Sequence, residues 1–152
     1  MSSKIINYFL NSVLDIMPQL GFSNIEKGDI FVKESNIKVE GVMLNLGVVG
    51  DIKGNVIYNM SEVDAKKIAS KMMMGMPVSE FDDMAQSAIS ELSNMLTAKA
   101  SINLEKEGIN TNISTPTLTH GKDFEVKTNT DKIITSEVLV DGISIEVNIA
   151  FE

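Results

Sequence analysis

Two polar side chains that can do chemistry, Glu91 and Asn94, stand three positions apart in a segment whose apolar residues recur at helical spacing. Residues three or four apart lie on one face of an α-helix, so this carboxylate and this amide are expected to point the same way, one turn apart. The carboxylate can pair with a cation, and the amide can both donate and accept hydrogen bonds. Such a pair is common on solvated helices, so its surroundings decide whether it forms a site.

The helix that carries the pair has two different sides. The predicted core side consists of Met84, Ala85, Ala88, Ile89, Leu92, Met95 and Leu96. The opposite stripe reads Asp83, Ser87, Ser90, Glu91, Asn94 and Ala98, and most of its side chains are small. A flat strip of this kind lets the backbone of another protein approach while the two longer polar groups reach into its surface. The predicted partner-binding residues are Asp83, Gln86, Ser87, Ser90, Met95 and Ala98.

The chain lacks the residues that most other kinds of catalytic site require. The absence of cysteine and the single histidine, His120, exclude thiol nucleophiles, thiolate zinc sites and paired-histidine metal sites. The sequence Thr119-His120-Gly121 is turn-like, which favours a surface loop over a catalytic base. The acids Glu80, Asp82 and Asp83 are better explained as residues matched to a helix dipole than as metal ligands. We therefore predict no metal and no cofactor held by this chain.

Length and charge narrow the class of protein. The 152 residues fit a single domain, 1–152, and the net charge of −8 comes without a basic patch of the kind that nucleic acid requires. The longest apolar runs are near ten residues, whereas a membrane-spanning helix needs about twenty. The first residues, Met1 to Lys4, lack a secretory pattern. We expect a cytoplasmic protein that binds neither nucleic acid nor membrane.

Three helices are predicted from the spacing of apolar residues and from capping patterns. They span Lys4 to Leu20, Glu62 to Met74, and a longer segment that opens at Ser79-Glu80-Phe81-Asp82 and continues to about Leu104. The first helix and the long helix share their apolar spacing, which places Ser12 and Asp15 where the long helix has Glu91 and Asn94. This similarity is better explained by two unrelated amphipathic helices than by an internal repeat.

Strand patterns fill the remaining segments. They occupy Asp29 to Asn59, a stretch around Asn112 to Leu118, Ile133 to Val140, and Ile143 to Phe151. The dipeptide Asp141-Gly142 suits a tight hairpin turn, and the alternation after it places Ser144, Glu146 and Asn148 in water. Helices and strands come in runs, which predicts an α+β fold: two long helices plus an N-terminal helix on a largely antiparallel sheet of about six strands.

The surroundings of the pair resemble a known family. The stretch Asp82 to Leu96, DDMAQSAISELSNML, closely resembles the signature helix of the CheC, CheX and FliY family of chemotaxis phosphatases. The glycine-punctuated strands from Met43 to Tyr58, and Ala65 to Gly75 with its methionine-rich end, are similar to the family's elements, so the likeness runs from about Val42 to Ala100. One Glu-Leu-Ser-Asn site resembles CheX rather than two-site CheC. The family often has glycine where Ser93 stands and near Ala98.

This resemblance implies a phosphatase that hydrolyses the aspartyl phosphate of a CheY-type response regulator in two-component signalling. Asn94 would hydrogen-bond a water in line with the leaving carboxylate, and Glu91 would pair with the lysine of the receiver domain. The receiver would supply Mg²⁺. A general-base role for Glu91 is less favourable, because its carboxylate would face a phosphoryl anion. The resemblance also implies a homodimer formed by joining sheet edges, for which the C-terminal strands are suitable material.

Two alternatives remain open from the residues. A related sheet-and-helix domain could bind a receiver or a flagellar switch component without hydrolysing anything. The cluster Met72, Met73, Met74 and Met76 could form an adaptable surface, although core packing is expected for two of the four.

Overall fold

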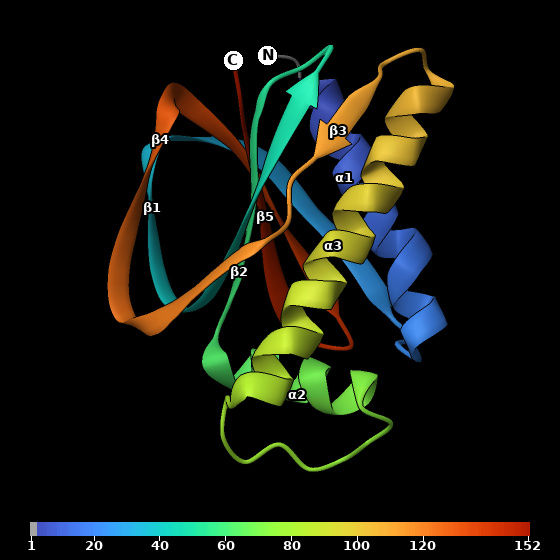
Figure 1. The fold of residues 1–152 in the computed structure, drawn as a ribbon, viewed down its shortest axis with the longest axis vertical. Helices are drawn as coiled ribbons and strands as arrows, with labels where there is room; N and C mark the ends of the chain where they lie inside the picture. The colour runs from blue at the N-terminus through green and yellow to red at the C-terminus, as the bar shows by residue number, and fades with distance from the viewer. Residues whose placement is uncertain (1–2) are drawn as a thin grey trace.

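The computed structural model describes residues 3–152 and places three helices on an antiparallel sheet of five strands. In Figure 1 the helices lie together on one side of the sheet, and α2 lies near the beginning of α3. The elements in chain order are α1 (Ser3–Ile16), the short 3-10 helix η1 (Met17–Leu20), β1 (Ile25–Gly50), β2 (Gly54–Met60), α2 (Glu62–Met72), α3 (Asp83–Lys106), β3 (Thr111–Ile113), β4 (Thr117–Val140) and β5 (Ile143–Phe151). The predicted α+β class is confirmed.

The first two helices follow the predicted patterns closely. The apolar stripe of α1, which includes Phe9 and Val13, is buried, and the chain tightens into η1 where Pro18 enters. The side chain of Ser61 caps α2 by accepting a hydrogen bond of 3.0 Å from the backbone N–H of Asp64. The helix ends before Met74, whose φ of 59° is left-handed. It is therefore two residues shorter than predicted.

The long helix α3 begins later than predicted. Its N-cap is Asp82, which accepts a hydrogen bond of 3.0 Å from the backbone N–H of Ala85, so the expected start at Ser79 is wrong. The preceding chain is held by the burial of Phe81 and by a 2.9 Å hydrogen bond from Gln86 Nε2 to the Phe81 carbonyl. Helical geometry can start only after that anchored residue.

Two long strands make most of the sheet. β1 and β4 pair over nearly their whole length, from Ile25 opposite Val140 to Asn45 opposite Thr117, with three shifts of register. Figure 1 shows this ribbon arching away from the helices. The second half of β1 also pairs with β2, β2 pairs with β5, and β5 pairs with β4. Segments predicted as separate strands merge into β1 and β4, which is why there are five strands rather than about six.

The arch of β1 and β4 creates a second core on the face of the sheet away from the helices. Its buried members are Ile37, Val39, Met43, Ile57, Ile133 and Ala150, and Phe124 and Val126 pack against them. This covered face explains why the predicted exposure of Asn148 is wrong, since that side chain is fully buried. Ser144 and Glu146, predicted on the same wet face, are only partly exposed.

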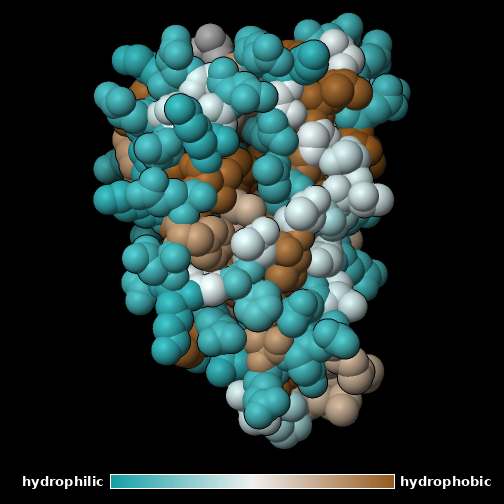
Figure 2. All heavy atoms as spheres, turned by 60° about the vertical axis from the view of Figure 1, so that its left-hand side comes forward, coloured by the Kyte–Doolittle hydropathy of each residue, from teal (hydrophilic) through white to brown (hydrophobic). Residues whose placement is uncertain are grey.

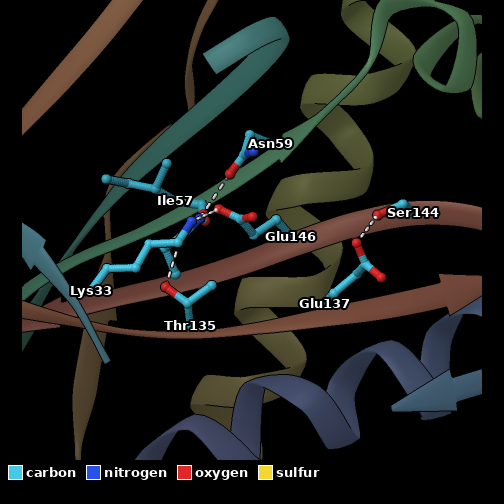
Figure 3. A network of polar contacts seen from close by, with 8 residues as sticks. Lys33, Ile57, Asn59, Thr135, Glu137, Ser144 and Glu146 are labelled. Carbon is cyan, nitrogen blue, oxygen red and sulfur yellow. Dashed lines mark hydrogen bonds and ion pairs between the residues drawn. The ribbon is translucent and has the colours of Figure 1, made fainter. Parts of the chain in front are cut away.

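The buried amide of Asn148 has hydrogen-bond partners for both of its polar atoms. Its Nδ2 donates to the Ile57 carbonyl at 3.1 Å and to Asn59 Oδ1 at 2.8 Å, and its Oδ1 accepts from Thr135 Oγ1 at 2.8 Å. Figure 3 shows these contacts beside the ion pair that joins Lys33 Nζ to Glu146 Oε1 at 2.6 Å. Together these contacts link β1, β2, β4 and β5 to one another. They also give the buried amide the hydrogen bonds that a buried polar group requires.

His120 also lies in a setting that the local sequence did not reveal. It belongs to β4, paired with Val42 of β1, and its ring meets the ring of Phe81 edge-on at 5.4 Å between centroids. The predicted surface loop at His120 is therefore wrong, although the residue is exposed. Of the helices in the described part of the chain, none is long and apolar enough to cross a membrane.

Candidate active site on helix α3

Glu91 and Asn94 lie near the middle of α3, and both side chains are exposed. Within residues 3–152 neither side chain makes a hydrogen bond or an ion pair. The predicted orientation is thus observed: a carboxylate and an amide, one helical turn apart, face solvent with their hydrogen-bonding capacity unused. Both groups are available to a partner molecule.

The opposite side of α3 packs into the main core. Its buried apolar residues are Ala85, Ile89, Leu92, Leu96, Ala100 and Leu104. Ala88 and Met95, predicted on this side, are half-buried at its margin. Met84 was predicted in the core, but 62% of its surface is exposed, because an open hollow between α2 and α3 leaves it uncovered.

Two polar residues, Ser93 and Thr97, lie on the buried side of α3, and Thr97 attaches the helix to the sheet. Ser93 Oγ donates to the Ser90 carbonyl at 2.7 Å, and Thr97 Oγ1 donates to the Ser93 carbonyl at 2.7 Å. The hydroxyl of Tyr58, on β2, lies 2.9 Å from Thr97 Oγ1. Since the single Thr97 proton is already donated, the Tyr58 hydroxyl is the donor of this contact.

Tyr58 is fully buried, and burial raises the pKa of its hydroxyl. Sequence reasoning missed this anchor. Its signal was the pair of hydroxyl residues, Ser93 and Thr97, four positions apart on the core side of the helix. The anchor fixes the rotation of the helix three residues beyond Asn94.

The strip around Glu91 and Asn94 carries mostly small side chains, as predicted. Asp83 and Ser87 are exposed, and Ser90 and Ala98 are half-buried. Gln86, which was predicted to contact a partner, is half-buried and its amide is engaged by the Phe81 carbonyl. Its structural role in this chain is to hold the segment that precedes α3.

Beside the strip lies an open hollow of about 390 Å³ between α2 and α3. It is lined by Met72, Met73, Asp83, Met84, Ser87, Ala88 and Glu91, and we call it the methionine hollow. Glu91 belongs both to the functional pair and to the wall of this hollow. Across residues 3–152 no group of three or more His, Asp or Glu side chains lies close enough to hold a metal ion.

The first helix presents no second copy of this site. Ser12, which aligns with Glu91, is completely buried, and its Oγ donates to the Phe9 carbonyl at 2.6 Å. Asp15, which aligns with Asn94, is exposed but has no neighbour of the required kind one turn before it. Among residues 3–152, α3 is therefore the helix that presents a carboxylate and an amide in this arrangement.

Comparison with known proteins agrees with this architecture. Residues 42–136 match the family model described as chemotaxis phosphatase CheX. The CheY-P phosphatase CheX of Thermotoga maritima is 34% identical over 128 residues, which is 84% of this chain and 82% of that protein. The crystal structure of CheX from Desulfovibrio desulfuricans superposes with a TM-score of 0.87 at 18% identity, over 98% of this chain and 99% of that one.

CheX from Borrelia burgdorferi, crystallised as a CheX-CheY-BeF3-Mg complex, superposes with a TM-score of 0.78 at 25% identity, over 97% of each chain. Three helices on an antiparallel sheet of five strands match the fold of these CheX and CheC-like proteins. The chain belongs to the CheX family of chemotaxis phosphatases.

Proposed function

We propose that this protein hydrolyses the aspartyl phosphate of a CheY-type receiver domain, with Glu91 and Asn94 as the groups that enter the receiver's active site. The observation that carries the proposal is the exposure of both side chains on a small-residue strip, without a hydrogen bond or an ion pair to the described chain. Support also comes from the similar Thermotoga maritima protein, a CheY-P phosphatase, and from the Borrelia burgdorferi protein that was crystallised with CheY.

Asn94 acts by positioning water. Its amide donates a hydrogen bond to the phosphoryl group or accepts one from a water molecule placed in line with the phosphorus and the leaving aspartyl oxygen. The water oxygen forms a bond to phosphorus, the bond from phosphorus to the aspartyl oxygen breaks and releases the aspartate carboxylate, and both water protons leave with inorganic phosphate. Mg²⁺ bound to the receiver neutralises charge on the phosphoryl oxygens. Orientation of this kind lowers the barrier without a covalent intermediate.

Glu91 acts on the receiver rather than on the water. Its carboxylate pairs with the lysine that contacts the phosphoryl group in the receiver, which places Asn94 at the correct depth. A carboxylate that removed a proton beside the phosphoryl anion would be opposed by like charge, whereas an ion pair with lysine is favoured by opposite charge. Glu91 is thus a docking group.

The chain's own packing keeps the pair ready for this contact. Leu92 and Leu96 bury the opposite side of α3, and the hydrogen bonds that link Tyr58, Thr97 and the Ser93 carbonyl fix its rotation. Because the helix does not have to rearrange when the receiver binds, little of the interaction energy is lost to ordering.

We also propose that the protein forms a homodimer in the cytoplasm through its sheet. The C-terminal strand β5 cannot supply the joining edge that was expected of it, because both of its edges are paired, with β2 and with β4. The early part of β1 pairs on one edge only, with β4, and exposes Ile30, Phe31 and Val32. Exposed strand edges of this kind are prone to pairing, so we assign the dimer contact to the ribbon of β1 and β4. Light scattering that gives a monomer mass would refute this assignment.

The experiment that tests the catalytic proposal follows phosphate release from a phosphorylated CheY-type receiver in Mg²⁺. Wild-type protein should accelerate release, and Asn94→Ala should lower kcat by about 10²- to 10³-fold, the effect of losing one preorganised hydrogen-bonding group. The matched control is Asn103→Ala, the same change on the opposite side of the same helix, which should keep the wild-type rate. Equal acceleration by wild type and Asn94→Ala would refute water positioning, and binding without acceleration by either would indicate a non-catalytic module.

A further inference from the structure

The methionines between α2 and α3 form a surface that the catalytic proposal does not use. Met72 and Met73 are half-buried, whereas Met74, Met76 and Met84 are exposed by 96%, 57% and 62%. In Figure 2 a group of moderately hydrophobic side chains lies at the lower end of the molecule, the end at which Figure 1 places α2 and the loop to α3. Large exposed apolar side chains that gather at one place mark an interaction surface.

Hydrogen bonds hold the backbone of this turn, although its side chains are exposed. Ser70 Oγ donates to the Met76 carbonyl at 2.7 Å, and the N–H of Gly75 donates to the Ser70 carbonyl at 2.8 Å. Both Met74 and Gly75 have positive φ, of 59° and 85°. A bulky residue in this left-handed conformation has an energetic cost, and the hydrogen bonds on either side hold it there. These hydrogen bonds hold the backbone of the turn in place, while the exposed methionine side chains remain flexible.

The methionine hollow is continuous with the catalytic strip. Glu91 and Ser87 belong to both surfaces, so a protein that reaches the Glu91 carboxylate lies beside the hollow. Four of the lining residues are apolar, which favours an apolar occupant: Met72, Met73, Met84 and Ala88. The charged members of the lining, Asp83 and Glu91, favour a basic group beside that occupant.

We propose that the methionine hollow is a second docking site that takes one exposed apolar side chain of the receiver, located beside the receiver lysine that pairs with Glu91. This inference rests on the proposed function and adds receiver selection to it. Methionine side chains are flexible, so the hollow adapts to an aliphatic or a small aromatic residue. A receiver with an acidic residue at that place is disfavoured, because its carboxylate would lose water beside the carboxylates of Asp83 and Glu91.

The test replaces Met84 with a residue that abolishes the apolar character of the hollow. Met84→Asp should weaken binding of a beryllofluoride-loaded receiver by about tenfold and raise KM for the phosphorylated receiver similarly, with kcat unchanged. The control is Ile102→Asp. Ile102 is 49% exposed and stands eighteen residues further along α3, which is five helical turns, so it lies on the same face about 27 Å away. This control should change Kd and KM by less than about twofold. Met84→Leu should restore wild-type values, and thermal melting should show all three variants folded.

The outcomes separate this inference from the catalytic proposal. Unchanged Kd and KM for Met84→Asp, or a fall in kcat alone, would overturn the second docking site while hydrolysis by the wild type still stands. Weaker binding by Met84→Asp with no hydrolysis by the wild type would support the docking site and refute the catalytic role. A wild-type protein that neither binds nor hydrolyses the phosphorylated receiver would refute both.

Discussion

The hydroxyl pair that attaches α3 to the sheet allows a quantitative prediction about two nearly isosteric substitutions. Tyr58 and Thr97 are each 1% exposed, and their oxygens lie 2.9 Å apart. Tyr58→Phe removes the donor and leaves Thr97 bonded to the Ser93 carbonyl at 2.7 Å. The expected loss in the free energy of unfolding is about 0.5–1.5 kcal/mol, the net value of one hydrogen bond.

Thr97→Val should cost more, although it removes no volume. It deletes the acceptor and leaves the Tyr58 hydroxyl buried without a partner, since no other hydrogen bond reaches that oxygen within the described residues. An unsatisfied buried donor costs about 1–3 kcal/mol. Threonine and valine have similar helix propensities, so propensity does not mask the difference. The double variant should lose less stability than the sum of the two single variants, because Tyr58→Phe removes the stranded hydroxyl.

Urea unfolding of the four proteins measures these differences, and thermal melting provides a second reading. For a chain of this length each kcal/mol lowers Tm by about 2–4 °C. Equal losses for Tyr58→Phe and Thr97→Val, or strict additivity in the double variant, would refute the assignment of Tyr58 as donor and Thr97 as its only acceptor.

Two further predictions concern exposed carboxylates. Glu91→Gln should leave the free energy of unfolding within about 0.5 kcal/mol of wild type, because Glu91 has no partner in the described chain. The same variant should lower kcat/KM for the phosphorylated receiver by about 10- to 100-fold, the value of a charge-assisted hydrogen bond, and wild-type kcat/KM would contradict the docking role. Hydrogen bonds from the backbone N–H of Asn24, the larger effect, and from that of Ser23 hold the pKa of Asp141 below its ordinary value. The ionised carboxylate therefore stabilises the fold above about pH 4, and this stabilisation is lost as the pH falls through the lowered pKa. Asp141→Asn, which tolerates the positive φ of this turn, should therefore be less stable than wild type near pH 7 and equal to it in strong acid, as acid titration of the unfolding midpoint would show.

The exposure of Glu91 and Asn94 was predictable because helical periodicity is a local property. Leu92 and Leu96 point to the core, and residues one turn apart on the other side must face outward. The turn at Asp141-Gly142 was equally local, since both residues take positive φ there. For such features the pattern of neighbouring residues contains the whole explanation.

Features that depend on distant segments were not predictable in this way. Asn148 alternates with apolar residues, the pattern of a residue on the solvent-facing side of a sheet. The arch of β1 and β4 covers that side, however, and buries Asn148. Met84 has the spacing of a core residue, but α2 ends too early to cover it. The start of α3 depended on the burial of Phe81, which competes with the capping pattern at Ser79.

The central claim is geometric, so a structure of this protein bound to a receiver loaded with beryllofluoride and Mg²⁺ tests it most directly. The distance to measure runs from the Asn94 side-chain amide to the beryllofluoride group. We predict hydrogen-bonding reach, about 2.6–3.2 Å or the same through one water molecule, with the Glu91 carboxylate on the receiver lysine. A complex in which the receiver binds another face, with Asn94 in solvent, would contradict the account.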